Sequence, residues 1–240
     1  MDPIAKYISQ KISKTRWQPI SPALLQQPEV FATGSWDNEA GALNNKVSIW
    51  SVGDHGVSNM DGEFDEEPQL LCDSKHDGDV MDLQFLDHDR LVSASSSGAV
   101  KIFKLQSDCQ ALSLAHVWER AHRYSCDNAP CTAIVCKSPE IVSVGEDGRV
   151  ILYKADQTEV LRVIGGWNSR VVSHSAAPLA GENDSVVSAW LAGDSSKNRL
   201  EATHILPSQT LSVNSLDVLE QCLVCGTDGE AVYVHRQVPV

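Results

Sequence analysis

The sequence predicts an all-β chain whose repeated units form a β-propeller with about four to five recognisable blades. The first observation is self-similarity, since residues 91–103, 141–153 and 222–234 superimpose without gaps. The second is the content of each copy, a short apolar strand, a small polar turn ending in glycine, and a second apolar strand. The third is that no stretch has helical periodicity. Repetition favours a propeller over a sandwich, which is the alternative.

The remaining strands complete units of four. A looser hairpin copy joins Phe31–Asp37 to Lys46–Trp50, with residues 38–45 lengthening its turn. Alternating or apolar runs precede the other hairpins at Val80–Leu86, Cys131–Cys136 and Leu211–Leu219, and follow them at Gln69–Cys72, Leu112–Trp118 and Val160–Ile164. The last hairpin has no strand after it. Ile4–Gln10 is therefore expected to supply the outer strand of the last blade and to help seal the structure.

The hairpin turns are the structural residues that the sequence singles out: Gly98, Asp147, Gly148, Asp228 and Gly229. Tight reversals need a residue with positive φ, which glycine adopts without the steric cost of a Cβ. The second strand ends on an aromatic residue at Trp50, Phe103 and Tyr153. In the last copy Tyr233 comes one residue early and Val234 takes that position.

The spacing of the hairpins is irregular, and it predicts an incomplete or reclosed ring. The first two gapless copies start at Leu91 and Ile141, whereas the third starts only at Cys222, which leaves room for about two blades of ~40–45 residues. That interval holds two strand-like runs, Ser185–Leu191 and Arg199–Leu206, without a glycine turn in register. We therefore divide the chain into a strand and blades one to three over 1–164, a loop-rich junction over 165–184, and a partial blade and last blade over 185–240.

Composition narrows the classes of function. The net charge of −13 disfavours direct binding to nucleic acid, and the basic residues near the start (Lys6, Lys11, Lys14 and Arg16) are expected to belong to a solvated strand. No apolar run is long enough to span a membrane, and the N-terminus does not look like a secretory signal. Seven irregularly spaced cysteines in a chain of 240 residues indicate reduced thiols, as in the cytosol or nucleus.

No catalytic, cofactor or metal site is predicted. Cys222 and Cys225 lie three apart on a strand, so their sulfur atoms should point to opposite faces, and both are expected in the core. His76 precedes a strand where a histidine typically forms hydrogen bonds within a blade. Serine, histidine and aspartate are abundant but fall into no known catalytic motif. The acidic segment Asp54–Glu67 is expected to be a solvated loop, the alternative being a contact for a basic partner.

Several strings are more distinctive than a general repeat motif. They are SQKISKTRW (9–17), FATGSWDNE (31–39), QLLCD (69–73), GDVMDLQF (78–85), VGEDGR (144–149), SVNSLDVL (212–219) and CLVCGTD (222–228). On these strings the chain resembles the small WD-repeat nucleoporin of the Y-shaped outer-ring complex of the nuclear pore. The resemblance covers nearly the whole chain. It implies a non-enzymatic scaffold that binds other outer-ring nucleoporins, the α-solenoid subunits, without nucleic acid, membrane insertion or a small-molecule substrate.

The resemblance fails at one place. The family has complete seven-bladed rings, whereas here Val163-Ile164, which resembles the end of the third blade, runs directly into Gly165-Gly166, which resembles a region late in the sixth. An internal deletion of the central blades explains the irregular spacing. The family further implies location at the nuclear pore and at the kinetochore in mitosis, and roles in protein and mRNA transport and pore assembly. The alternatives are a different WD adaptor, such as a ubiquitin-ligase substrate receptor, or a shortened form without function.

Overall fold

A computed structural model gives the fold of the chain. It describes residues 3–20, 27–36, 44–52, 67–107, 109–165, 188–191, 201–204, 212–236 and 238. Most of the long first turn (38–43), the acidic segment through residue 66 and most of the junction (166–184) lie outside these residues. All regular secondary structure in the described part is β-strand.

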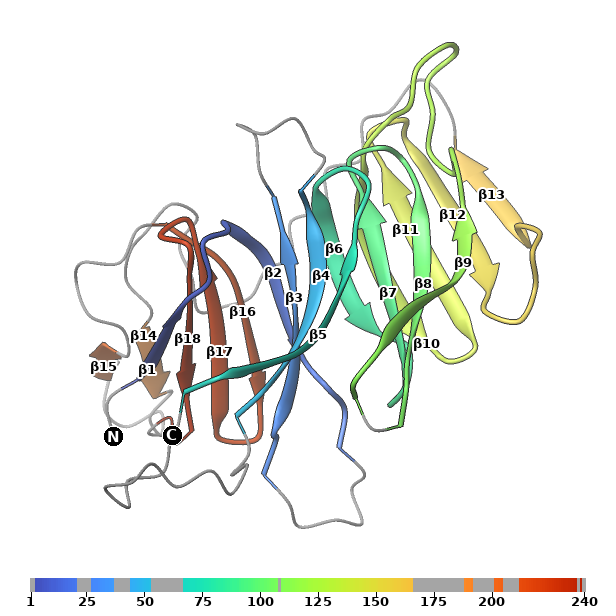
Figure 1. Cartoon of the computed structure of the whole chain (residues 1–240). Coiled ribbons are helices and arrows are strands. Elements are labelled where there is room, and N and C mark those ends of the chain that lie inside the picture. The colour runs from blue at the N-terminus through green and yellow to red at the C-terminus, as the bar shows by residue number, and fades with distance from the viewer. Residues whose placement is uncertain are drawn as a thin grey trace.

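Four antiparallel sheets of four strands each form the blades, and they follow one another in an open arc (Figure 1). Blade one contains β2 (Ile12–Trp17), β3 (Val30–Ser35), β4 (Lys46–Ser51) and β5 (Gln69–Lys75). Blade two contains β6 (Val80–Phe85), β7 (Arg90–Ser95), β8 (Val100–Leu105) and β9 (Leu112–Trp118). Blade three contains β10 (Cys131–Lys137), β11 (Glu140–Gly145), β12 (Arg149–Lys154) and β13 (Arg162–Gly165).

The last blade joins the two ends of the chain. Its sheet runs β1-β18-β17-β16, with β1 (Ile4–Tyr7) on the outside and β16 (Val213–Leu219), β17 (Cys222–Thr227) and β18 (Ala231–His235) from the other end. Ile4 pairs with Val234 and Tyr7 with Ala231. This confirms that the N-terminal segment supplies the outer strand. A further pair of strands, β14 (Ser188–Leu191) and β15 (Glu201–His204), forms a separate two-stranded sheet.

The last hairpin has a different register from the one that gapless alignment of the sequence indicates. Ile141 pairs with Tyr153 in blade three, and the corresponding pair in the last blade is Leu223 with His235. The hairpin is therefore shifted by one residue. Gly98 and Gly148 adopt a positive φ of 81° and 72° in their turns. In the last blade the residue with a positive φ is Glu230, at 55°, and not Gly229.

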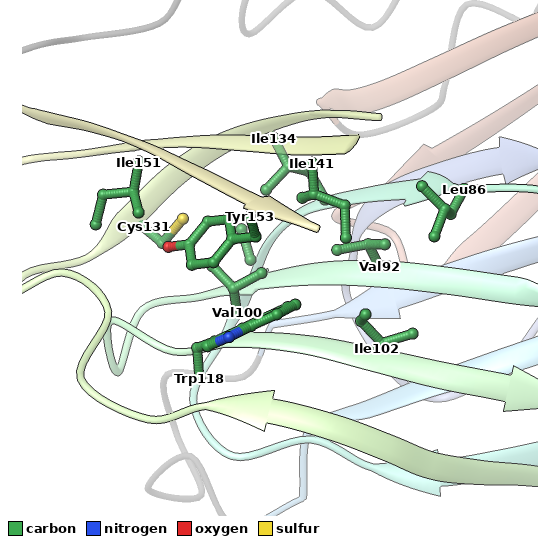
Figure 2. Packing of buried hydrophobic residues seen from close by; sticks show 11 residues of the cluster. Leu86, Val92, Val100, Ile102, Trp118, Cys131, Ile134, Ile141, Ile151 and Tyr153 are labelled. Atoms are coloured by element: carbon green, nitrogen blue, oxygen red, sulfur yellow. The ribbon is translucent and has the colours of Figure 1, made fainter. Parts of the chain in front are cut away.

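Each interface between blades is an apolar layer made by two sheet faces. Between blades two and three, Val92, Val100 and Ile102 from one sheet meet Ile134, Ile141 and Tyr153 from the other, and all are at most 2% exposed. Figure 2 shows these side chains converging from both sheets, with the Trp118 ring below Val100. The rings of Trp118 and Tyr153 lie 4.5 Å apart. Similar layers join blade one to blade two and the last blade to blade one.

Candidate functional site: hydrogen-bond networks and exposed faces of the blades

Blade three contains a buried chain of four polar side chains. The Nδ1 atom of His122 lies 2.8 Å from the Asp147 carboxylate, and its Nε2 atom lies 2.7 Å from the Ser143 hydroxyl. That hydroxyl lies 2.9 Å from the hydroxyl of Tyr153. Asp147 also accepts hydrogen bonds from the backbone N–H groups of Arg123 and Arg149, at 3.0 and 3.1 Å. This hydrogen-bond network thus fixes the loop before β10 to the β11–β12 turn.

The direction of each proton follows from the chemistry of the partners. A carboxylate only accepts, so His122 donates from Nδ1 to Asp147, and its unprotonated Nε2 accepts from Ser143. Ser143 then accepts from Tyr153. Burial lowers the pKa of His122 because the charged imidazolium would lose its hydration, although Asp147 opposes this shift. The network is therefore assembled around a neutral histidine.

A Ser–His–Asp series in this order resembles the triad of a hydrolase, and sequence reasoning did not foresee it. Its surroundings assign it to structure. Ser143 and His122 are 0% exposed. The Ser143 hydroxyl is held between a histidine and a tyrosine, both within the blade. A nucleophile must reach the reacting atom directly. The Ser143 oxygen is buried, so a substrate carbonyl could not approach it.

The corresponding positions in the other blades retain parts of this network. In blade two, Ser93 takes the position of Ser143, and His76 is 2.9 Å from its hydroxyl and 2.8 Å from the Gly78 carbonyl. Phe103 replaces the tyrosine there. In blade one, Trp50 donates from Nε1 to Thr33 at 2.9 Å. Burial lowers the pKa of His76 to about 4, so this histidine is also neutral near pH 7.

The shifted register removes the last blade from this pattern. Cys225 takes the position of Ser143, and Gly229 that of Asp147. Asp228 lies one position earlier, where it accepts a hydrogen bond from Asn214 at 2.7 Å. Cys222 and Cys225 lie in different apolar layers, on opposite faces of β17. Burial raises the pKa of Cys225 to about 12, as expected for an unreactive core thiol.

A second set of hydrogen bonds joins neighbouring blades along their innermost strands. In the last blade, Ser215 and Asp217 accept from the backbone N–H groups of Thr15 and Trp17, at 3.0 and 2.7 Å. In blade two, Asp82 and Gln84 take the same register positions, and they accept from Ile134 and Cys136 at 3.0 and 3.2 Å. The sequence did not reveal these pairs, because they become visible only once the strands are in register.

Blade one has cations at the two acceptor positions, Lys14 and Arg16. At its junction with blade two, the inner-strand side chain of blade one is therefore the donor and not the acceptor. Arg16 donates to the Asp82 carboxylate of blade two at 3.2 Å, and the same oxygen accepts from the backbone of Leu83 at 2.8 Å. Burial lowers the pKa of Lys14, whose charge Asp82 favours in turn. Lys14 and Arg16 are thus partly buried at the junction between two blades, so the expectation of a solvated strand is wrong for these two residues.

Two hollows on the described surface have residues that could line a site. A cavity of about 130 Å³ lies against blade one, beside Trp50 and Ile12 and under Ile8 and Gln10 of the segment between β1 and β2. This is smaller than the ~300–1,000 Å³ of typical ligand sites. A broader groove of about 510 Å³ lies along the β8–β9 turn beside His88 and Lys104. In the described ranges, no group of three or more acidic, histidine or cysteine side chains is placed to hold a metal ion. Nor does any described helix have the length and apolarity to cross a membrane.

Comparison with known proteins places the chain in context. It is 35% identical to nucleoporin Nup43 of Mus musculus and 34% identical to that of Homo sapiens, over 98% of this chain and 98% of each relative. Among solved structures, the WD40 β-propeller domain of Doa1 matches 87% of the chain at 17% identity, and the chain covers 61% of that protein, with a TM-score of 0.42. The computationally designed Ika4 protein also gives a TM-score of 0.42, at 14% identity, with 96% of this chain and 93% of that chain covered. No family model matches the sequence.

Repeated four-stranded blades, two of which contain a buried histidine–serine contact, define a WD-repeat β-propeller. Within that class, the chain belongs to the Nup43 family of nucleoporins. The alignment spans 377 positions and nearly all of both proteins, whereas this chain has 240 residues, so over a hundred positions of the relative have no counterpart here. The missing positions lie inside the matched region. The shortening is therefore internal, as the irregular hairpin spacing predicts.

Proposed function

We propose that this protein is a non-enzymatic scaffold that binds other nucleoporins in the outer ring of the nuclear pore. The observation that carries the proposal is the similarity to the Nup43 nucleoporins along 98% of both chains. The fold is consistent with it, because the blades form a rigid frame that presents loops and outer strands to partners. The buried Ser–His–Asp series is assigned to this frame.

The partners are proposed to be α-solenoid scaffold subunits, with no direct role for nucleic acid or a small-molecule substrate. Transport of protein and mRNA, pore assembly and a kinetochore role in mitosis are the processes in which such a scaffold would act. The structural turns at Gly98, Gly148 and their counterparts keep the blades aligned. We further propose that the missing segment falls between blade three and the two-stranded sheet, within or near residues 165–184.

Quantitative affinity purification tests this function. The tagged chain is expressed in cells beside a tagged complete relative, and co-purifying proteins are compared by mass spectrometry. We expect outer-ring nucleoporins with both baits, and fluorescence of the tagged chain at the nuclear rim. An Asp147→Ala variant, which breaks the blade-three network, is the control for dependence on the fold and should recover fewer nucleoporins.

Two outcomes would contradict the proposal. Recovery of cullin-type ligase subunits without nucleoporins would favour the alternative WD adaptor. Recovery of nucleoporins with the complete relative but none with this chain, when the chain is folded by circular dichroism, would show that the internal shortening abolishes the scaffold function.

A further inference from the structure

The outward face of blade three is an exposed apolar sheet surface at one end of the arc. Its apolar side chains share this face through the strand register: Ala133, Val135, Val142, Val144, Val150, Leu152 and Ile164, and Arg162 beside Leu152 lies at its β13 edge. We call this set the open face. Val135 is 64% exposed and Ile164 is 52% exposed. Figure 1 shows blade three at the end of the row of blades, with blade two on its other side.

The composition of the open face is that of a buried layer. The corresponding residues of blade two are Val92, Ala94, Val100 and Ile102, which are at most 2% exposed because blade three packs on them. Blade three has Val142, Val144, Val150 and Leu152 at these positions, each partly exposed. A contiguous apolar surface of this kind is comparable to the largest apolar patch of a typical monomer, and such a patch often serves as a binding surface.

The innermost strand indicates what kind of surface fits. Ala133 and Val135 stand where Ser215 and Asp217 of the last blade accept backbone N–H groups from the next blade. The open face therefore offers no such acceptor to the backbone of an incoming inner strand. An apolar sheet face needs no hydrogen-bond acceptor from the open face, because it presents only side chains to it. Two sheets pack face to face in this way in a sandwich.

Charges at one end of the open face are self-complementary. Glu140 is paired in register with Lys137 on one side and Lys154 on the other, and all three belong to the same face as Val135 and Leu152. A second copy related by a twofold axis and displaced by one strand would place Glu140 opposite a lysine. Closed twofold contacts use the same patch on both partners, so a patch that carries both signs suits them.

We propose that the open face binds the open face of a second copy of this chain, forming a twofold dimer by sheet-on-sheet packing. With strands ~4.8 Å apart and a rise of ~3.3 Å per residue, the face measures on the order of 300 Å². A stable interface buries about 800 Å² per partner, so the dimer is weak and depends on concentration. We expect a dissociation constant of about 10–500 µM.

Sedimentation velocity of the purified full chain tests the proposal from about 1 to about 500 µM, a range set by the expected weak affinity. The sedimentation coefficient should rise from that of a monomer to that of a dimer. Val135→Glu places a charge among the apolar side chains of the open face, on β10, and should raise the dissociation constant at least about tenfold. Leu114→Glu is the matched control, since Leu114 is 53% exposed on β9 of blade two, and it should dimerise like the original chain.

A second variant separates loss of contact from loss of fold. Glu140→Gln leaves the apolar side chains intact but removes the negative charge of the row, so it should weaken the dimer several-fold while the melting temperature stays close to that of the original chain. The proposal is wrong if the chain is monomeric throughout the concentration range. It is equally wrong if Val135→Glu and Leu114→Glu have the same effect, or if larger aggregates form without a discrete dimer.

Discussion

Buried histidines hold the polar networks of blades two and three. His122 belongs to a network of four polar side chains in which Asp147 also accepts from two backbone N–H groups, while His76 makes a simpler contact with Ser93 and a carbonyl. The sequence identified His76 because it lies just before a strand. It did not identify His122, which is nine residues from the start of β10, because a loop separates the two. Sequence spacing is informative only where the intervening loop is short.

Substitutions in the blade-three network should differ in a graded way. Asp147→Ala leaves the His122 Nδ1–H and two backbone N–H groups without an acceptor, so we expect it to lower the free energy of unfolding by about 3 kcal/mol. Tyr153→Phe removes one donor and should cost about 1 kcal/mol, since blade two already has Phe103 at that position. Tyr124→Phe, at an exposed hydroxyl, is the control and should have little effect. Urea unfolding measures all three, and equal losses for Asp147→Ala and Tyr153→Phe would contradict the assignment.

The pKa of His76 predicts a loss of stability in mild acid. Burial lowers this pKa from 6.5 to about 4, so between these values the unfolded chain binds a proton that the folded chain does not. The free energy of unfolding should therefore fall as pH falls through this window, by up to about 3 kcal/mol. Burial also lowers the pKa of His122, which adds to this loss of stability in acid. Burial raises the pKa of Asp217, which has the opposite effect on stability as pH falls.

The contribution of His76 can be isolated with His76→Gln, which does not titrate. Urea unfolding at pH 7 and pH 4.5 should show a smaller pH dependence for the variant than for the original chain, whatever its stability at pH 7. An unchanged pH dependence would mean that His76 does not resist protonation in the folded state.

At the scale of elements, the hairpins show how far sequence reasoning reaches. The apolar runs and glycine turns located the strands of all four blades, because strand periodicity and turn chemistry are local properties. The register of the last hairpin, by contrast, is not determined by residues that are close in the sequence. Cys222 and Val224 pack against blade one, whereas Leu223 and Cys225 lie in a separate apolar cluster on the opposite face, so packing between blades fixes which residues pair. Packing thereby moves the positive φ from Gly229 to Glu230.

This shift predicts opposite effects for substitutions in two equivalent turns. Glu230→Gly should stabilise the protein by roughly 0.5–1 kcal/mol, because glycine adopts positive φ without the penalty of a Cβ. Gly148→Ala should destabilise it by about 1–2 kcal/mol for the same reason. Gly229→Ala should be tolerated. Thermal unfolding followed by circular dichroism distinguishes the cases, and a larger loss for Gly229→Ala than for Gly148→Ala would restore the register that gapless alignment indicates.

The N-terminal strand is the element that links the two ends of the chain. β1 pairs with β18 over four residues, Ile8 donates to the Glu230 carbonyl, and Ile8 packs on the layer between the last blade and blade one. Deleting residues 1–10 should lower the melting temperature by roughly 10 °C, since losing several kcal/mol shifts a domain of this size by about 2–4 °C per kcal/mol. Tyr7→Ser, at a side chain that is 73% exposed, is the control. An unchanged melting temperature after the deletion would show that β1 does not secure the last blade.

At the scale of the whole molecule, the sequence predicted the propeller and its incompleteness but not the shape of the gap. Hairpin spacing showed that blades were missing, since the repeat length is a property of the chain. Which faces lose their cover depends on three-dimensional order. The described contacts run from the last blade through blades one and two to blade three, so only the open face and β13 lose both their neighbour and their burial. The inter-blade acceptors, such as Asp82 and Asp217, likewise depend on that order.

An open arc predicts a gradient of local stability. Stacked repeats contact only their neighbours, so units with both faces covered resist opening more than a unit at the end. Hydrogen exchange should therefore be slowest in β3, β4, β7 and β8 of the two middle blades and faster in β11 and β12 of blade three, although the strands have equivalent positions. β13 should exchange fastest, because all four of its residues are exposed. Exchange followed by mass spectrometry at concentrations where the chain is monomeric measures this order, and uniform protection of the three blades would indicate a closed ring.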